Sequence, residues 1–97
     1  MNAIGSHVSG LQHIGLPTND MEKTLAFYEK LGFTVAFRTV NNGEKVCFLK
    51  LAGVCVETYE NGQAVGTAGA IDHIALDVDD VQAAWDAVRA AGFAPLE

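Results

Sequence analysis

Three side chains in this sequence, His13, Glu57 and His73, are of the types that bind a divalent transition metal. The two histidines lie sixty positions apart, and each is the third residue of an apolar segment. Each shares its face of the expected strand with a small residue, Gly15 or Ala75, because alternate residues of a strand point to the same side. The other face carries Ile and Leu, so we expect both histidines on the side of the sheet turned away from the core.

Glu57 is the carboxylate that would complete such a site. It lies in the expected strand Val54–Glu60, between Val56 and Thr58. A carboxylate in a central strand is costly to bury without a partner. Two imidazoles and one carboxylate suit a divalent transition metal, and a site with open coordination positions is of the catalytic type. Singly, a strand His or Glu is more often solvent-exposed or hydrogen-bonded, and it is the duplicated histidine that favours a metal site.

The two histidine segments belong to an internal repeat with a sixty-residue period. Residues 11–33 and 71–93 share six identical positions. The identical pairs are His13/His73, Ile14/Ile74, Leu16/Leu76, Asp20/Asp80, Gly32/Gly92 and Phe33/Phe93. Such a repeat indicates two copies of one structural module.

The first copy has the pattern strand, helix, strand, strand, strand. The helix is expected at 21–31, with polar cap residues before it and Gly32 after it. Asn42-Gly43 and Ala52-Gly53 indicate turns between neighbouring strands. The expected strands are 11–17, 33–40, 45–51 and 54–60.

The chain divides into four parts. A flexible leader is expected at 1–10, the first βαβββ module at 11–60, a glycine-containing linker at 61–70, and the start of a second module at 71–97. The segment 71–97 holds one strand (71–78) and one helix (81–91), so we expect a second module truncated after its helix. Such an end leaves a strand edge and a helix face unburied, which favours association of two chains. We therefore expect a homodimer.

Composition excludes several classes of partner. The formal net charge is −6 with only six Lys and Arg, and no basic cluster is present, so neither nucleic acid nor a membrane surface is an expected partner. The longest apolar runs are far shorter than a transmembrane span. The first ten residues lack a basic start followed by an apolar stretch, so no secretory signal is expected. We expect a cytoplasmic protein with reduced thiols at Cys47 and Cys55.

The two turns predict which aromatic side chains lie near Glu57. A two-residue turn after residue 51 places Phe48 opposite Glu57, and the preceding hairpin places Phe37 beside Phe48. With Tyr59, these rings are candidates for the wall of a substrate cavity. Aromatic strand residues are more often part of a plain core, and that alternative stays open.

The sequence resembles the vicinal-oxygen-chelate superfamily, which includes glyoxalase I, bleomycin-resistance proteins and extradiol dioxygenases. The resemblance extends over residues 11–96. It is carried by residues 11–16, by Phe27-Tyr28-Glu29-Lys30-Leu31-Gly32-Phe33, by Glu57 and by residues 72–76. It implies an α+β fold in which paired βαβββ modules form a curved sheet around a metal, with His13, Glu57 and His73 as ligands. The fourth ligand of the family would lie beyond Glu97.

Within that family the first module is most similar to lactoylglutathione lyase-type sequences. The resemblance implies a metal-dependent glyoxalase I-like lyase or isomerase. Its substrate would be the hemithioacetal of a 2-oxoaldehyde and a thiol, such as glutathione, converted through an enediolate with Glu57 as the catalytic base. Nickel or zinc is the expected metal, and cobalt, manganese and iron are also compatible. Two alternatives are a metal-free protein that binds a bleomycin-type drug and a ring-cleaving dioxygenase.

Overall fold

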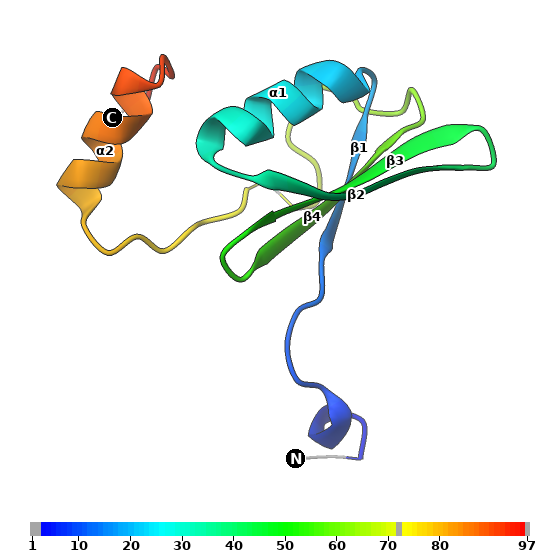
Figure 1. The fold of residues 1–97 in the computed structure, drawn as a ribbon. Helices are drawn as coiled ribbons and strands as arrows, with labels where there is room; N and C mark the ends of the chain where they lie inside the picture. Colours follow the sequence, from blue (N-terminus) through cyan, green and yellow to red (C-terminus); the bar gives the residue numbers. More distant parts are fainter. Residues whose placement is uncertain (1–2, 72, 97) are drawn as a thin grey trace.

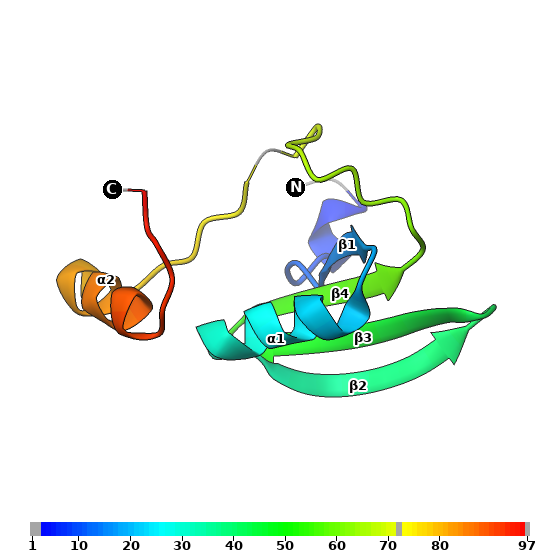
Figure 2. The ribbon, with the colours of Figure 1, turned by 90° about the horizontal axis from the view of Figure 1, so that it is seen from above.

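The first copy of the repeat folds as a βαβββ unit in the computed structural model, which describes residues 3–71 and 73–96. Strand β1 (Ile14–Thr18) leads into helix α1 (Met21–Leu31), and β2 (Thr34–Asn41), β3 (Glu44–Leu51) and β4 (Val54–Glu60) follow. Within the described residues these strands form one sheet in the order β1-β4-β3-β2. β1 pairs with β4 in parallel and the other pairs are antiparallel. α1 lies across one face of this sheet (Figures 1 and 2).

Local signals in the sequence define the two ends of α1. The carboxylate of Asp20 accepts a hydrogen bond from the Lys23 N–H at 3.1 Å, which caps the first turn. Gly32 adopts φ 113°, the left-handed conformation that ends many helices. Met21 and Leu25, four residues apart on one face, are fully buried against the sheet. The helix predicted from these signals is confirmed at both ends.

The core lies between α1 and the face of the sheet that it covers. Its members are buried apolar side chains from α1, from the start of β2, and from β3 and β4. They are Met21, Leu25, Phe33, Cys47, Leu49 and Val56. Arg38 and Glu22 also join β2 to α1 through an ion pair of 2.8 Å. The hydrogen bond and charge of Glu22 raise the pKa of Arg38. Both side chains are exposed, so this pair contributes little beside the core.

The strand registers predicted from the turns are confirmed. Asn42 and Gly43 adopt φ 51° and 81°, the pair of positive angles that suits a tight hairpin. Phe37 pairs with Phe48, after a register shift between Val35 and Phe37. Phe48 pairs with Glu57 across β3 and β4. The side chain of Glu57 therefore projects from the face opposite α1, since its neighbours Val56 and Thr58 are buried beneath the helix.

The predicted bounds of the first strand were wrong. β1 begins at Ile14 rather than at residue 11, and it includes Pro17, which we expected to end it. Proline is tolerated because β1 lies at the edge of the sheet, where its missing N–H costs no ladder hydrogen bond. His13 consequently lies just before the strand.

The second copy repeats the local signals but not the sheet. Helix α2 (Val81–Ala90) is capped by Asp80, which accepts from the Ala83 N–H at 3.0 Å, and Gly92 has φ 92°. The predicted strands at 71–78 and from 93 onward are absent over the residues that the structure describes. Asp72 and Glu97, which belong to these two predicted segments, lie outside the described residues. The first two residues of the predicted leader also lie outside them. A strand needs a neighbouring strand for its backbone hydrogen bonds, and residues 73–78 have none within the described chain.

α2 lies beside the sheet rather than on it, as Figures 1 and 2 show. None of its residues is buried in the described chain. The Phe93 ring that follows α2 packs edge-on against Phe27, with ring centroids 5.5 Å apart, and beneath the Lys30 ammonium. Neither α1 nor α2, within the described part of the chain, is long and apolar enough to cross a membrane.

Replacing Leu49 with alanine tests the position of the core. Leu49 is fully buried, so Leu49→Ala is expected to lower the free energy of unfolding by about 2–5 kcal/mol, measured by urea denaturation. Leu96 is 99% exposed, and Leu96→Ala is expected to stay within about 0.5 kcal/mol of the parent chain. Equal losses in the two variants would contradict this core.

Candidate functional site

His13 and Glu57 meet on the face of the sheet opposite α1. His13 Nε2 lies 3.5 Å from Glu57 Oε1, and the two side chains are 33% and 27% exposed. β4 holds Glu57 at the middle of the sheet, and β1 brings His13 to it through the parallel pairing of Gly15 with Glu57. The sequence predicted that these two side chains share a face, and the structure brings them together.

The other nitrogen of His13 is also engaged. Nδ1 lies 2.6 Å from Gln12 Oε1, an oxygen that can only accept, so the proton of the neutral ring is on Nδ1. Nε2 then directs its lone pair toward the Glu57 carboxylate. Two electron-rich atoms at this distance attract each other only when a proton or a metal cation lies between them. The arrangement resembles a metal-binding histidine, whose second nitrogen is oriented by an outer hydrogen bond.

Gly15 leaves open space beside this pair. A Cβ at this position would lie 3.5 Å from Tyr59 Cε1 and 3.9 Å from Glu57 Oε1. A methyl group therefore fits in ordinary contact, whereas a larger side chain would occupy the space next to the carboxylate. The absence of a side chain at Gly15 keeps Glu57 accessible from this side.

Aromatic side chains lie on the same face of the sheet as the pair, as the predicted registers require. The Phe48 ring packs edge-on against His13, with centroids 5.6 Å apart, and lies 6.4 Å from the ring of Phe37. Phe37 and Phe48 line a hollow of about 470 Å³, to which Gln12, Lys50 and Cys55 also contribute. Tyr59 does not line this hollow and instead lies close to Gly15. Whether the three rings bind a substrate stays a prediction.

The structure does not bring His73 to the other two predicted ligands. Its neighbours Ile74–Leu76 do line a small hollow of about 150 Å³ together with His13. Within residues 3–71 and 73–96, however, no three His, Cys, Asp or Glu side chains lie close enough to hold a metal ion. The segment carrying His73 thus reaches the neighbourhood of His13 without joining the pair.

The His13–Glu57 pair can be compared with the geometry of a metal site. Two ligand atoms, each about 2.1 Å from a tetrahedral ion, lie about 3.4 Å apart. The observed separation of 3.5 Å matches that value. Imidazole nitrogen and carboxylate oxygen are both good donors for zinc or nickel. The pair therefore fits as two ligands of a metal, and it does not by itself form a complete ligand set.

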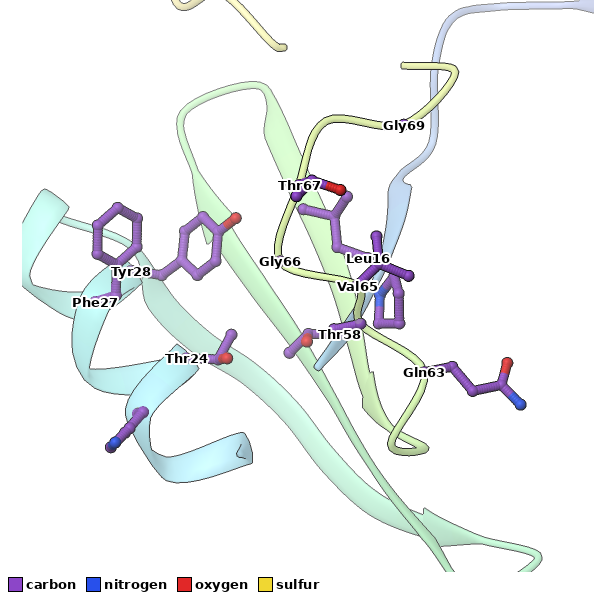
Figure 3. Close-up of a pocket in the computed structure, with 13 residues that line it drawn as sticks. Leu16, Thr24, Phe27, Tyr28, Thr58, Gln63, Val65, Gly66, Thr67 and Gly69 are labelled. Carbon is purple, nitrogen blue, oxygen red and sulfur yellow. The ribbon is translucent and has the colours of Figure 1, made fainter. Parts of the chain in front are cut away.

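A second hollow, of about 550 Å³, lies on the helix side of the sheet. Figure 3 shows Thr24 and Tyr28 of α1 on one side and Leu16, Val65 and Thr67 on the other. Burial raises the pKa of Tyr28. Sequence reasoning missed this hollow because residues 61–70 read as a linker, whereas Asn19 and Ala64 join this segment to the end of β1 through two hydrogen bonds.

The helix-side hollow offers less chemistry than the opposite face. Thr58 Oγ1 is buried there without a hydrogen-bond partner in the described part of the chain. Lys23 and Tyr28 are its ionisable lining residues, and the described residues that line it include neither a carboxylate nor an imidazole. An acid–base or metal-assisted reaction is therefore better supported at His13 and Glu57.

Comparisons with known proteins agree with the fold and the resemblance. Residues 10–97 match the family described as the Glyoxalase/Bleomycin resistance protein/Dioxygenase superfamily. The chain is 33% identical to a lactoylglutathione lyase of Haemophilus influenzae, with 82% of this chain and 66% of that protein covered. It is 34% identical to a probable lactoylglutathione lyase of Vibrio parahaemolyticus, with 82% and 64% covered. The chain thus spans slightly less than two thirds of the length of these relatives.

Solved structures share the same fold. A glyoxalase family protein from Enterococcus faecalis superposes with a TM-score of 0.67 at 20% identity, covering 87% of this chain and 73% of that one. A bleomycin resistance determinant encoded on the transposon Tn5 gives a TM-score of 0.66 at 24% identity, covering 90% and 68%. The predicted glyoxalase-like α+β fold is confirmed.

The two cysteines are expected to differ in reactivity because they face opposite sides of the sheet. Both are free thiols; Cys47 is fully buried under α1, and burial raises its pKa. Less of its reactive thiolate is present at a given pH. Cys55 is only half-buried. At pH 8 we expect Ellman's reagent to modify Cys55 quickly and Cys47 only after denaturation.

Single serine variants assign the two phases of this reaction. Cys55→Ser should abolish the fast phase, and Cys47→Ser should retain it. A fast phase that persists in Cys55→Ser would show that Cys47 is accessible, against the packing described above.

Proposed function

Because the chain belongs to the Glyoxalase/Bleomycin resistance protein/Dioxygenase superfamily, we propose that it is a glyoxalase I-like lyase or isomerase. Its substrate is the hemithioacetal that a 2-oxoaldehyde forms with a thiol, either glutathione or another. The observation that carries this proposal is the contact of His13 with Glu57 on the uncovered face of the sheet. The names of the two lactoylglutathione lyase relatives support the same substrate class.

The proposed reaction is an internal proton transfer. Glu57 removes the proton from the carbon that bears the sulfur, and the electron pair forms an enediolate with the neighbouring carbonyl. A proton then returns to the neighbouring carbon, the hydroxyl on the sulfur-bearing carbon loses its proton to become the carbonyl, and the second oxygen gains a proton, which yields a 2-hydroxyacyl thioester. Atoms and electrons balance without an oxidant or reductant. Gly15 leaves the space in which the reacting carbons approach the carboxylate.

A divalent metal, nickel or zinc, would stabilise the two adjacent oxygens of the enediolate as a Lewis acid. His13 and Glu57 are the two ligands that the geometry supports. His73 is the proposed third ligand. It would join them after the segment 71–78 moves, or it would come from a second copy of the chain.

One alternative function has a specific observation in its favour. Only two of the predicted ligands meet within the described residues, which suits a metal-free protein that binds a small molecule in the same aromatic hollow. Ligand binding that persists at full strength after treatment with a chelator would favour this alternative over the lyase.

Glu57→Gln tests the lyase proposal with little change in shape. The amide cannot accept the proton, so we expect kcat for a methylglyoxal–glutathione hemithioacetal to fall by a factor of about 10²–10⁴. Thioester formation followed by ultraviolet absorbance measures this rate. His13→Ala is expected to reduce the bound metal, measured by elemental analysis of the purified protein.

His7→Ala is the matched control for the loss of an imidazole, since His7 lies in the short 3₁₀ turn of the leader, Gly5–His7. It should leave both rate and metal content unchanged. Full activity in Glu57→Gln would reject Glu57 as the base.

We also propose that the chain is a homodimer. Ile74, Leu76, Val78 and Val81 are between 41% and 75% exposed, and α2 has no buried residue in the described chain. Burial of this apolar segment against a second copy would remove it from water. Light scattering should then give twice the chain mass of 10.3 kDa. Leu76→Asp should shift the population to monomer, and a parent chain that is already monomeric would exclude the dimer.

A further inference from the structure

The aromatic hollow on the open face contains a cation that the proposed chemistry does not use. Lys50 lines this hollow together with Phe37 and Phe48. It projects from β3 on the same face as Phe48, because the two residues are two positions apart. Its cross-strand partner is Cys55, which brings no negative charge opposite the ammonium at the level of the strand pair.

Lys50 has no carboxylate partner among residues 3–71 and 73–96. Two other cations of the sheet are paired: Arg38 with Glu22 at 2.8 Å and Lys45 with Glu60 at 3.8 Å. Lys23, Lys30 and Arg89 also lack a carboxylate partner within the described residues, and Lys50 differs from them because it lines the aromatic hollow. This ammonium is therefore free to bind an anion from outside the chain.

A second hydrogen-bond donor lines the same hollow. Gln12 uses its oxygen to accept from His13, and its amide N–H groups have no partner within the described residues. The hollow thus combines two donors, Lys50 and Gln12, with the apolar faces of Phe37 and Phe48. A carboxylate attached to an apolar or aromatic group is the chemical complement of this lining.

The strand register fixes how far this cation lies from the candidate reaction centre. Phe48 pairs with Glu57 and Lys50 with Cys55, so Lys50 is anchored two residues along the sheet from the carboxylate. With about 3.3 Å per residue along a strand and about 4.8 Å between neighbouring strands, the two Cα positions are about 8 Å apart. A single small molecule can extend over this distance.

We propose that this hollow is the binding subsite for a carboxylate-bearing apolar tail of the substrate, with Lys50 as the residue that selects the negative charge. The substrate class is then an adduct whose thiol or aldehyde component carries a carboxylate on an apolar or aromatic group. This substrate class rests on the proposed lyase function, whereas the subsite itself is defined by the hollow and can be tested without turnover.

The experiment measures binding of 3-phenylpropionate to the metal-free chain, with 3-phenylpropionamide as the neutral probe. Chemical shift changes of backbone amides give the dissociation constants. We expect the parent chain to bind the acid more tightly than the amide. Lys50→Gln should weaken binding of the acid about fivefold and leave the amide unchanged. Phe48→Leu should weaken both probes, because the ring packs on the carbon body that they share.

Lys45→Gln is the matched control, since it removes the same charge from the same strand. Lys45 pairs with Glu60 on the helix side of the sheet and does not line the hollow. Its binding constants should equal those of the parent chain. Equal affinity for acid and amide, no binding of the acid, or an equal loss in Lys45→Gln and Lys50→Gln would overturn the subsite.

The two proposals fail separately. Binding that depends on Lys50 in a chain without lyase activity would retain the subsite and reject the lyase. Turnover of a hemithioacetal in which Lys50→Gln changes neither KM nor acid binding would retain the lyase and reject the subsite.

Discussion

The alternation of side chains along β4 is the constraint on which the rest of the structure depends. β4 pairs with both β1 and β3, so its residues determine both faces of the sheet at the centre. Val56 and Thr58 are fully buried beneath α1, while Glu57 projects to the opposite face. A slip of one residue would turn Glu57 into the core and expose Val56, at a large cost in free energy. The same register of β4 therefore both buries the core residues and places Glu57 on the open face.

Local signals account for the parts of the fold that the sequence predicts well. Asp20 and Gly32 define α1 because capping depends on backbone groups within a few residues. The hairpin at Asn42-Gly43 and the turn after Leu51 define the registers by counting outward from each turn, and these registers place Phe48 opposite Glu57. The contact of Glu57 with His13 also depends on the parallel pairing of β1 with β4. No turn connects β1 with β4, so counting from a turn cannot predict this contact, and only the repeat and the resemblance indicate it.

The predictions that failed depend on partners distant in the sequence. Residues 71–78 have the same alternating pattern as the first strand, yet within the described residues no strand pairs with them. α2 forms nevertheless, since Asp80 supplies its cap locally, but its apolar face covers no sheet within the part of the chain that the structure describes. The position of His73 therefore depends on how this unpaired segment packs, and the sequence repeat alone does not predict it. No sequence pattern predicts the helix-side hollow, because its wall forms where residues 61–70 are held to the end of β1 by Asn19 and Ala64. Nor does a pattern predict that Lys50 lacks a carboxylate partner within the described residues.

The polarity of the Gln12–His13–Glu57 chain decides which chemistry the open face supports. Gln12 Oε1 accepts from Nδ1, so the neutral ring turns a lone pair toward a carboxylate 3.5 Å away. This contact is unfavourable until positive charge lies between the two atoms. An enediolate also requires positive charge beside its two oxygens, so the cation that stabilises the side chains would stabilise the intermediate as well. Lys50, two residues along β3 from Phe48, cannot supply that charge at the same point, and its position instead suits the far end of a substrate. Under the two proposals, the face therefore divides into a centre that would hold a proton or metal and a flank that would bind an anion.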